Sequence, residues 1–189
     1  MARWLALGFG IAVTAALWWR ALWLPPEWDP TQPLDFRAPR TWVTRWKFER
    51  LQTDPDLCVR ALATADLRWR RVEGMSGGLC PLPDAVRVIQ GDVPTVPSSF
   101  LASCRLAVDW FVFLRDVAEP EARSRYGVGL SRVEHLGSYN CRDVREKPGR
   151  LSSHARADAI DVTAFVLPDG RRIAVADWRH HGRATDFLP

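Results

Sequence analysis

The chain has 189 residues, of which 47% are hydrophobic, and this is enough to bury one substantial core. We therefore expect a single globular domain in addition to any N-terminal segment. The net charge of +4 comes from 26 basic and 22 acidic residues, and the basic residues are scattered along the chain. This distribution argues against a dedicated nucleic-acid-binding protein, which would show a basic stripe or a recognisable reading motif. A mild positive charge suits an anionic neighbour, such as lipid headgroups or an acidic wall polymer, and equally suits a surface with no partner.

The N-terminus carries an apolar run from Trp4 to Leu24 that only Arg20 interrupts. Its length is close to the roughly 20 residues that cross a bilayer. The pair Trp18-Trp19 is typical of a membrane–water interface. The alternative is a cleaved signal peptide, but bulky residues occupy the positions where a small-x-small cleavage site is needed. The pattern predicts an uncleaved transmembrane helix within residues 1–24, inserted in the inner membrane.

Residues 25–40 contain five prolines and few apolar residues, which predicts an extended tether. The folded domain is expected over residues 41–189. Thr41 can cap a helix that continues to Leu51, and Asp54 followed by Pro55 predicts a second helix to about Ala65.

The middle of the domain predicts one short strand and one long helix. Residues 85–89 alternate as a strand does, and residues 99–118 repeat apolar side chains at helical spacing. Further strands are expected over residues 128–136 and over 159–167, the latter turning at Pro168-Asp169-Gly170 into 171–175. Helices first and antiparallel strands later predict an α+β domain with a small antiparallel sheet.

Four widely spaced cysteines, Cys58, Cys80, Cys104 and Cys141, form no C-x-x-C pair, which excludes zinc-ribbon and thioredoxin motifs. An even number of separated cysteines in an exported chain predicts two disulfides. Three pairings are open from sequence alone. Pairing of sequence neighbours, Cys58 with Cys80 and Cys104 with Cys141, is favoured. An oxidising compartment fits both the cysteines and the N-terminal segment, so the domain is expected in the periplasm.

The chemistry-bearing residues gather between Gly137 and Asp161. If a strand begins at Ala159, Asp161 points away from the core, towards a cleft. His154 lies a few residues upstream, in a segment that can fold back over the strand. Imidazole and carboxylate are both good zinc ligands, and a catalytic zinc needs one further protein ligand and a water. The competing interpretation is a surface histidine beside an aspartate that accepts hydrogen bonds from backbone amides.

The sequence between Trp42 and Leu188 resembles the extensin-like C-terminal domain family of proteobacteria. Its segment 152–161 is also similar to the first half of the zinc site of D-alanyl-D-alanine metallopeptidases. The matching pieces are Trp42–Lys47, the cysteine positions, Cys104–Ala107 with Trp110, Gly137–Arg142, Arg150–Ala155 with Ala159–Asp161, Asp169–Arg171, Asp177-Trp178 and Phe187-Leu188.

The resemblance implies a domain related to peptidoglycan peptidases, with the corresponding fold and with wall peptide as its partner. It implies that His154 and Asp161 are two zinc ligands. Arg142 is then a clamp for a substrate carboxylate, since a planar guanidinium can form two hydrogen bonds to it; its alternative role is a surface ion pair. Ser152 would orient one of the ligands.

The family pattern continues past the Phe-Leu motif to closely spaced histidines that supply the third ligand and the catalytic base, whereas this sequence stops at Pro189. The remaining candidates, His180 and His181, follow the Asp-Trp motif in a predicted loop. We therefore expect an incomplete zinc site. The leading hypothesis is a zinc peptidoglycan peptidase-like protein. Its rivals are a non-catalytic module that binds wall peptide and an envelope-scaffolding domain.

Overall fold

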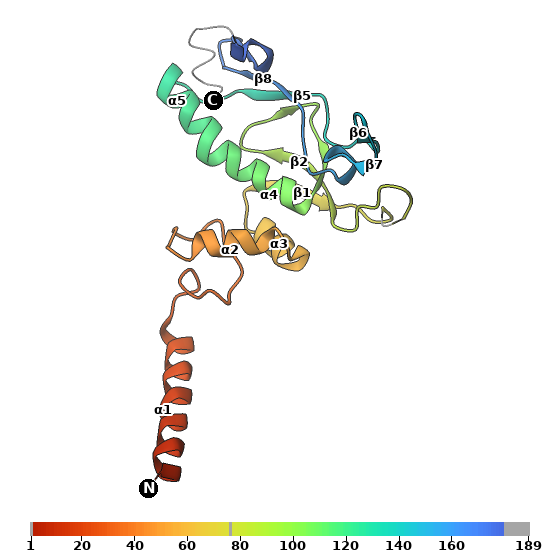
Figure 1. Cartoon of the computed structure of the whole chain (residues 1–189). Helices are drawn as coiled ribbons and strands as arrows, with labels where there is room; N and C mark the ends of the chain where they lie inside the picture. Colours follow the sequence, from red (N-terminus) through yellow and green to blue (C-terminus); the bar gives the residue numbers. More distant parts are fainter. Residues whose placement is uncertain (1, 76, 180–189) are drawn as a thin grey trace.

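The computed structural model describes residues 2–75 and 77–179, and it is an α+β structure with three small sheets. The helix α1 (Ala2–Trp23) comes first and projects away from the rest of the chain (Figure 1). The part of the chain from residue 41 onward contains the helices α2 (Thr44–Leu51), α3 (Pro55–Leu62), α4 (Cys104–Phe113) and α5 (Glu119–Tyr126). The predicted α+β class is confirmed.

The prediction of a transmembrane helix within residues 1–24 is wrong. Within residues 2–75 and 77–179, no helix is both long and apolar enough to cross a membrane. Residues Ala2–Trp23 are helical, but the stretch between Arg3 and Arg20 is shorter than the roughly 20 apolar residues that a bilayer requires.

The strands form two main sheets and one separate hairpin. The first sheet joins β1 (Leu67–Arg71), β2 (Ala85–Gly91) and β4 (Phe100–Ser103), all antiparallel. The second has the order β3 (Thr95–Val96), β5 (Arg132–His135), β8 (Val162–Val166) and β9 (Arg172–Ala174), with β3 and β5 parallel. The hairpin consists of β6 (Asp143–Val144) and β7 (Lys147–Leu151).

One main core joins α3, α4 and both main sheets. Leu62 of α3, Val108 of α4, Val86 of β2 and Val133 of β5 are all fully buried in it. A second, smaller cluster around Leu82 and Leu101 also includes Ala157, close to the chemistry-bearing segment. Figure 1 shows α4 and α5 as one long rod that runs along the strands, with α2 and α3 on the side nearer α1.

The predicted hairpin at residues 159–175 is confirmed, although its first strand begins later, at Val162. Gly170 has a φ of 84°, a value that favours glycine, and the amide of Leu167 donates to the carbonyl of Arg171 across the turn (2.9 Å). The Asp169 carboxylate accepts from the Arg171 amide (3.0 Å) and tightens the same turn.

The long predicted helix of residues 99–118 differs from the structure at both ends. Phe100–Ser103 is the buried strand β4, and the helix begins only at Cys104, where the Ser103 hydroxyl accepts from the Leu106 amide (3.1 Å). A short apolar run fits either a strand or a helix, so its periodicity could not settle the type. At the other end, a π-helical turn (Leu114–Ala118) carries the helix into α5, which contains Pro120 and ends at Gly127. Proline lacks an amide hydrogen, and the widened turn accommodates that loss.

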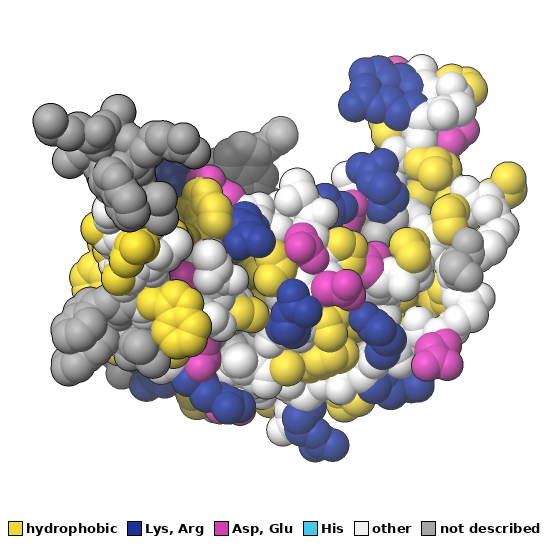
Figure 2. Space-filling model, turned by 90° about the horizontal axis from the view of Figure 1, so that it is seen from below, with side chains coloured by type: hydrophobic (Ala, Val, Ile, Leu, Met, Phe, Trp, Pro, Cys, Tyr) yellow, Lys and Arg dark blue, Asp and Glu magenta, His cyan; other side chains and the backbone are white. Residues whose placement is uncertain are grey.

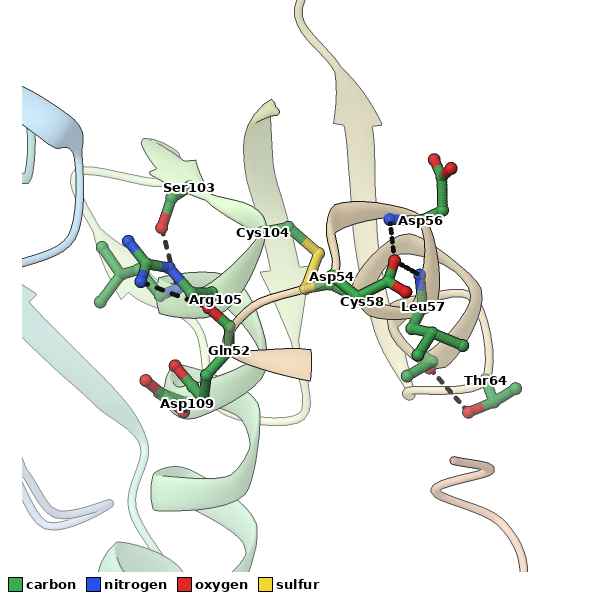
Figure 3. The surroundings of a disulfide bond; sticks show 12 residues. Gln52, Asp54, Asp56, Leu57, Cys58, Thr64, Ser103, Cys104, Arg105 and Asp109 are labelled. Atoms are coloured by element: carbon green, nitrogen blue, oxygen red, sulfur yellow. Dashed lines mark hydrogen bonds between the residues drawn. A yellow bond between two sulfur atoms is a disulfide. The ribbon is translucent and has the colours of Figure 1, made fainter. Parts of the chain in front are cut away.

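The two disulfides are confirmed, but the favoured pairing is wrong. Cys58 bonds Cys104, and Cys80 bonds Cys141, with Cα–Cα distances of 6.1 and 5.8 Å. Because the β1–β2 hairpin follows α3, Cys58 is carried away from Cys80 and towards α4, against which α3 packs. Figure 3 shows the Cys58–Cys104 bond between these two helices.

The same view shows the predicted cap of α3. The Asp54 carboxylate accepts from the amides of Asp56 (3.1 Å) and Leu57 (3.0 Å), and Pro55 occupies the first helical position (Figure 3). The expected cap of the preceding helix is not formed: α2 begins at Thr44, and the Thr41 hydroxyl donates instead to the carbonyl of Glu27 (2.9 Å).

The segment expected to be an extended tether packs against the domain. Leu34 is buried in the main core, and the Lys47 ammonium and the Arg50 guanidinium donate to the carbonyls of Pro26 and Pro30. Proline carbonyls remain acceptors, so a proline-rich segment can still be fixed by cations from a neighbouring helix.

Charged side chains are distributed over the surface. On the face that Figure 2 shows, Lys and Arg side chains lie scattered among acidic and hydrophobic ones. Some of the charged side chains form ion pairs. On the second sheet, for example, the Glu134 carboxylate of β5 contacts Arg132 (3.2 Å) and Arg172 (2.7 Å). The face in Figure 2 therefore presents charges of both signs, and its basic side chains are scattered, as the sequence indicates.

Candidate functional site

The segment that follows β7 folds into a compact turn that presents His154. The 3₁₀ turn η2 (His154–Arg156) begins after Ser152, a buried residue whose hydroxyl accepts from the Ala155 amide (3.2 Å). The turn closes at Ala157, whose φ of 52° lets its amide donate back to the carbonyl of His154 (3.1 Å). Ser152, predicted to orient a zinc ligand, therefore acts on the backbone of the turn.

The turn is fixed from two sides. The Ser103 amide, at the start of α4, donates to the carbonyl of Ala157 (2.9 Å). The Asp158 carboxylate accepts from Arg105 of α4 (2.8 Å) and from Arg156 (3.2 Å), while its other oxygen, Oδ1, is buried without a hydrogen-bond partner in the described part of the chain. This attachment to α4, which the sequence pattern did not indicate, sets the position of His154 relative to the core.

The structure brings His154 and Asp161 together. The imidazole Nε2 lies 3.3 Å from Asp161 Oδ1, and the side chains are 16% and 61% exposed, respectively. Asp161 immediately precedes β8, and its backbone pairs with residues 136 and 137 just beyond β5. The carboxylate is thus at the protein surface, and the imidazole is mostly covered.

The other imidazole nitrogen determines the tautomer of His154. Nδ1 lies 3.0 Å from the carbonyl oxygen of Ser138, which can only accept, so Nδ1 carries the hydrogen. In the neutral ring, Nε2 then presents a lone pair to the Asp161 carboxylate. A proton on Nε2 or a metal ion between the two groups would make this contact attractive, because the lone pair and the carboxylate oxygen are both acceptors.

Residues 137–142 form the other side of the site. The Ser138 hydroxyl donates to the carbonyl of Leu101, and the Asn140 amide donates to the carbonyl of His154 (3.1 Å). Cys141 is bonded to Cys80. The disulfide therefore holds the segment whose Ser138 carbonyl orients the imidazole. Sequence reasoning singled out this segment but assigned no role to Ser138.

Arg142 lies at the edge of the site. Its carbonyl accepts from the Ser152 amide (3.0 Å), whereas its guanidinium is exposed and makes one long hydrogen bond, to the carbonyl of Asp143 (3.4 Å). Among the described residues this guanidinium forms no ion pair, so the surface-pair alternative gains no support and the carboxylate-clamp hypothesis stays a prediction.

His135 has a different environment. Its Nε2 hydrogen bonds the carbonyl of Pro97 (3.0 Å), and its Nδ1 accepts from the Gly137 amide (3.1 Å). Desolvation lowers the pKa of this buried imidazole below its ordinary 6.5, although the hydrogen bond to Pro97 opposes the shift. With both nitrogens engaged, His135 is a structural residue.

A third metal ligand is not found beside the pair within the described ranges. No group of three His, Cys, Asp or Glu side chains there is arranged to hold a metal. His180, His181 and the Phe187-Leu188 motif lie outside the described residues. The described part of the chain thus supplies two ligands of suitable chemistry.

One comparison with known proteins gives a match. The family model described as "Extensin-like protein C-terminus" matches residues 56–189. No curated protein and no solved structure matches the chain. The matched region contains all four cysteines and the whole of the candidate site.

Proposed function

Because the chain belongs to the family of the extensin-like protein C-terminus, we propose that its folded domain binds zinc through His154 and Asp161 and acts on peptidoglycan peptide in the periplasm. The observation that carries the proposal is the arrangement of His154: Nδ1 donates to a backbone carbonyl and Nε2 faces a carboxylate at 3.3 Å. A histidine whose second nitrogen is fixed by a backbone acceptor is the usual form of a metal ligand.

A catalytic zinc site needs a third protein ligand and an open position for water. The described residues supply no third ligand; His180 and His181, the remaining candidates from the sequence, lie outside them and within the matched family region. Zinc held in this way would supply Lewis-acid activation of water for the hydrolysis of a peptide bond. His154 and Asp161 would hold the metal. Because Asp161 is exposed, a substrate could reach the metal from the protein surface.

Arg142 is the proposed contact for a substrate carboxylate. Its guanidinium is exposed, and its backbone carbonyl accepts a hydrogen bond from the Ser152 amide, which joins Arg142 to the turn that carries His154. A planar guanidinium can bind a carboxylate through two parallel hydrogen bonds. Wall peptides end in a carboxylate, so Arg142 and the metal would bind the two ends of a short substrate segment.

The proposed location rests on the two disulfides. Both bonds are buried or partly buried and link distant parts of the chain. Structural disulfides of this kind form in oxidising compartments, which favours an exported domain.

Zinc titration of the 189-residue chain tests the proposal. Two ligands alone bind zinc weakly, so we expect purified protein to carry much less than one zinc per chain and to bind added zinc with low affinity. His154→Ala and Asp161→Asn should each weaken this binding by about tenfold or more, since each removes one of the two ligands. The matched control Asp66→Asn removes an exposed carboxylate that is not part of the site and should leave zinc binding unchanged.

The double substitution His180→Ala, His181→Ala decides the source of the third ligand. If the chain binds zinc tightly and this change releases it, the terminal histidines complete the site. Zinc binding that persists unchanged in both His154→Ala and Asp161→Asn would refute the proposed metal site.

The alternative function is a non-catalytic module that binds wall peptide or other envelope proteins. The absence of a third ligand beside the pair within the described ranges favours it. Co-sedimentation with purified peptidoglycan separates the two: a binding module should co-sediment equally with and without a chelator, and His154→Ala should not release it. The zinc-dependent domain should lose both binding and any cleavage of wall peptides when zinc is removed.

A further inference from the structure

A pocket of about 730 Å³ lies between the segment 26–41, helix α2 and the stretch where α4 passes into the π-helical turn. Its volume is within the range of small-molecule sites. The lining residues all come from positions 26–48 and 112–116, so the pocket is separate from the His154–Asp161 pair. It therefore represents a second candidate binding site on the same domain.

The walls of the pocket are mainly apolar. Leu34, Phe36, Phe48 and Val112 line it, together with several prolines. The Phe36 ring is fixed by an edge contact with Phe111 (centroids 5.2 Å apart) and by the Arg115 guanidinium over its face (5.6 Å). A polar peptide would leave amide groups unpaired against such walls, which favours a ligand with a hydrocarbon body.

One buried cation lines the same pocket. Lys47 is only 3% exposed, and its Nζ donates to the carbonyl of Pro26 (2.6 Å). An ammonium has three hydrogens to donate, and this is the one acceptor found for it in the described part of the chain. Desolvation lowers the pKa of Lys47. The carboxylates of Asp29 and Glu27 attract the ammonium only at longer range and oppose this shift.

The other charged side chains that line the pocket are paired or exposed, except Glu27, which is half-buried and attracts the Lys47 ammonium at longer range. Asp116 is bound by both Arg40 and Arg115, and these contacts hold the pKa of its carboxyl below the ordinary value although its burial opposes them. Arg45 pairs with Glu49 (3.1 Å) at the surface. Within residues 2–75 and 77–179, Lys47 thus has no counter-ion in direct contact, and a covered charge is more stable when an opposite charge contacts it.

We propose that this pocket binds an amphipathic anion, whose acidic head group contacts the Lys47 ammonium and whose hydrocarbon chain lies along Phe36, Phe48 and Val112. The head group is either a carboxylate or a phosphate, since Lys binds both as a point charge. The ligand is therefore a fatty acid or a phosphorylated lipid fragment with a short chain.

Titration calorimetry with dodecanoate and with dodecyl phosphate, both below their micellar concentrations, tests the proposal and separates the two head groups. At least one anion should bind with 1:1 stoichiometry. Neutral dodecanol and cationic dodecylamine should bind about tenfold more weakly or not at all, because neither supplies a counter-ion. Methyl NMR shifts should change at Val112, in the pocket, and not at Val133, in the core.

Two variants locate the binding. Lys47→Met keeps the length of the side chain and removes the charge, and Val112→Trp fills the pocket from α4; each should weaken anion binding by about tenfold or more. Lys147→Met, the same change at the exposed lysine of β7, is the matched control and should have no effect. If neither anion binds, or if Lys47→Met and Lys147→Met bind equally well, the proposal is overturned. Should Lys47→Met fail to fold, Val112→Trp decides alone.

Discussion

His135 and His154 show how one residue type acquires two roles from its neighbours. Both nitrogens of His135 are occupied by backbone groups, whereas His154 keeps Nε2 directed at a carboxylate. The sequence places His154 seven residues before Asp161, close enough to predict that they meet. It does not reveal that Ser138, from another loop, fixes the tautomer, because that contact depends on how residues 137–142 pack beside the turn.

His135 makes stability depend on pH. Its pKa is lowered in the folded state by desolvation, so the unfolded chain binds the proton more readily. The stabilising contribution is complete above the unfolded value of 6.5 and is lost as the pH falls from there towards the folded pKa. We expect the free energy of unfolding to decrease between about pH 7 and about pH 5.5, a range above the titration of ordinary carboxylates.

Urea unfolding at several pH values measures this effect. His135→Gln can still donate to Pro97 and accept from Gly137 but does not titrate, so the decrease in this range should become smaller. An equal decrease in the wild type and in His135→Gln would assign the effect to other groups.

Helix and strand boundaries could be predicted from sequence where a cap or turn is stabilised by hydrogen bonds between residues close in sequence. Asp54-Pro55 and Pro168-Asp169-Gly170 fix the start of α3 and the β8–β9 turn through nearby contacts. The boundary at Ser103 could not be predicted in the same way, since Phe100–Ser103 becomes a strand only by pairing with β2. Composition also does not reveal that the carbonyls of Pro26 and Pro30 accept hydrogen bonds from Lys47 and Arg50 of α2.

The cap of α3 gives a prediction for stability. Asp54→Ala removes the acceptor for two amides at the helix start and should reduce the free energy of unfolding by about 1 kcal/mol. Asp54→Asn keeps a side-chain oxygen and should cost much less. Denaturant unfolding compares the two variants, and equal losses would show that the carboxylate charge, rather than the capping oxygen, stabilises the helix.

At the scale of the whole molecule, the two disulfides have different tasks. Cys58–Cys104 lies in the main core between α3 and α4, whereas Cys80–Cys141 holds the segment that orients His154. The pairing could not be predicted, because β1 lies between Cys58 and Cys80, and α4, α5 and β5 lie between Cys104 and Cys141. The family, in contrast, was identifiable from local motifs, and all of them except Trp42–Lys47 lie within the matched residues 56–189.

Removal of each disulfide separates these tasks. Replacing both members of either pair with alanine should cost about 2 to 5 kcal/mol of stability. Only the Cys80→Ala, Cys141→Ala variant should also weaken zinc binding while it remains folded, because only that bond holds the Ser138 carbonyl in place. Peptide mapping without reduction should identify the two bonds; a Cys58–Cys80 fragment, or equal zinc affinity in both variants, would contradict this assignment.

The central claim is that His154 is prepared as a zinc ligand, and imidazole ¹⁵N NMR of the chain tests it most directly. In metal-free protein, at a pH where the imidazole is neutral, we expect the single ring hydrogen of His154 on Nδ1 and none on Nε2. Added zinc should then shift the Nε2 resonance, leave the Nδ1 hydrogen in place, and leave His135 unchanged. A neutral ring with its hydrogen on Nε2 in place of Nδ1, or a His154 spectrum that zinc does not alter at saturating concentration, would contradict the assignment.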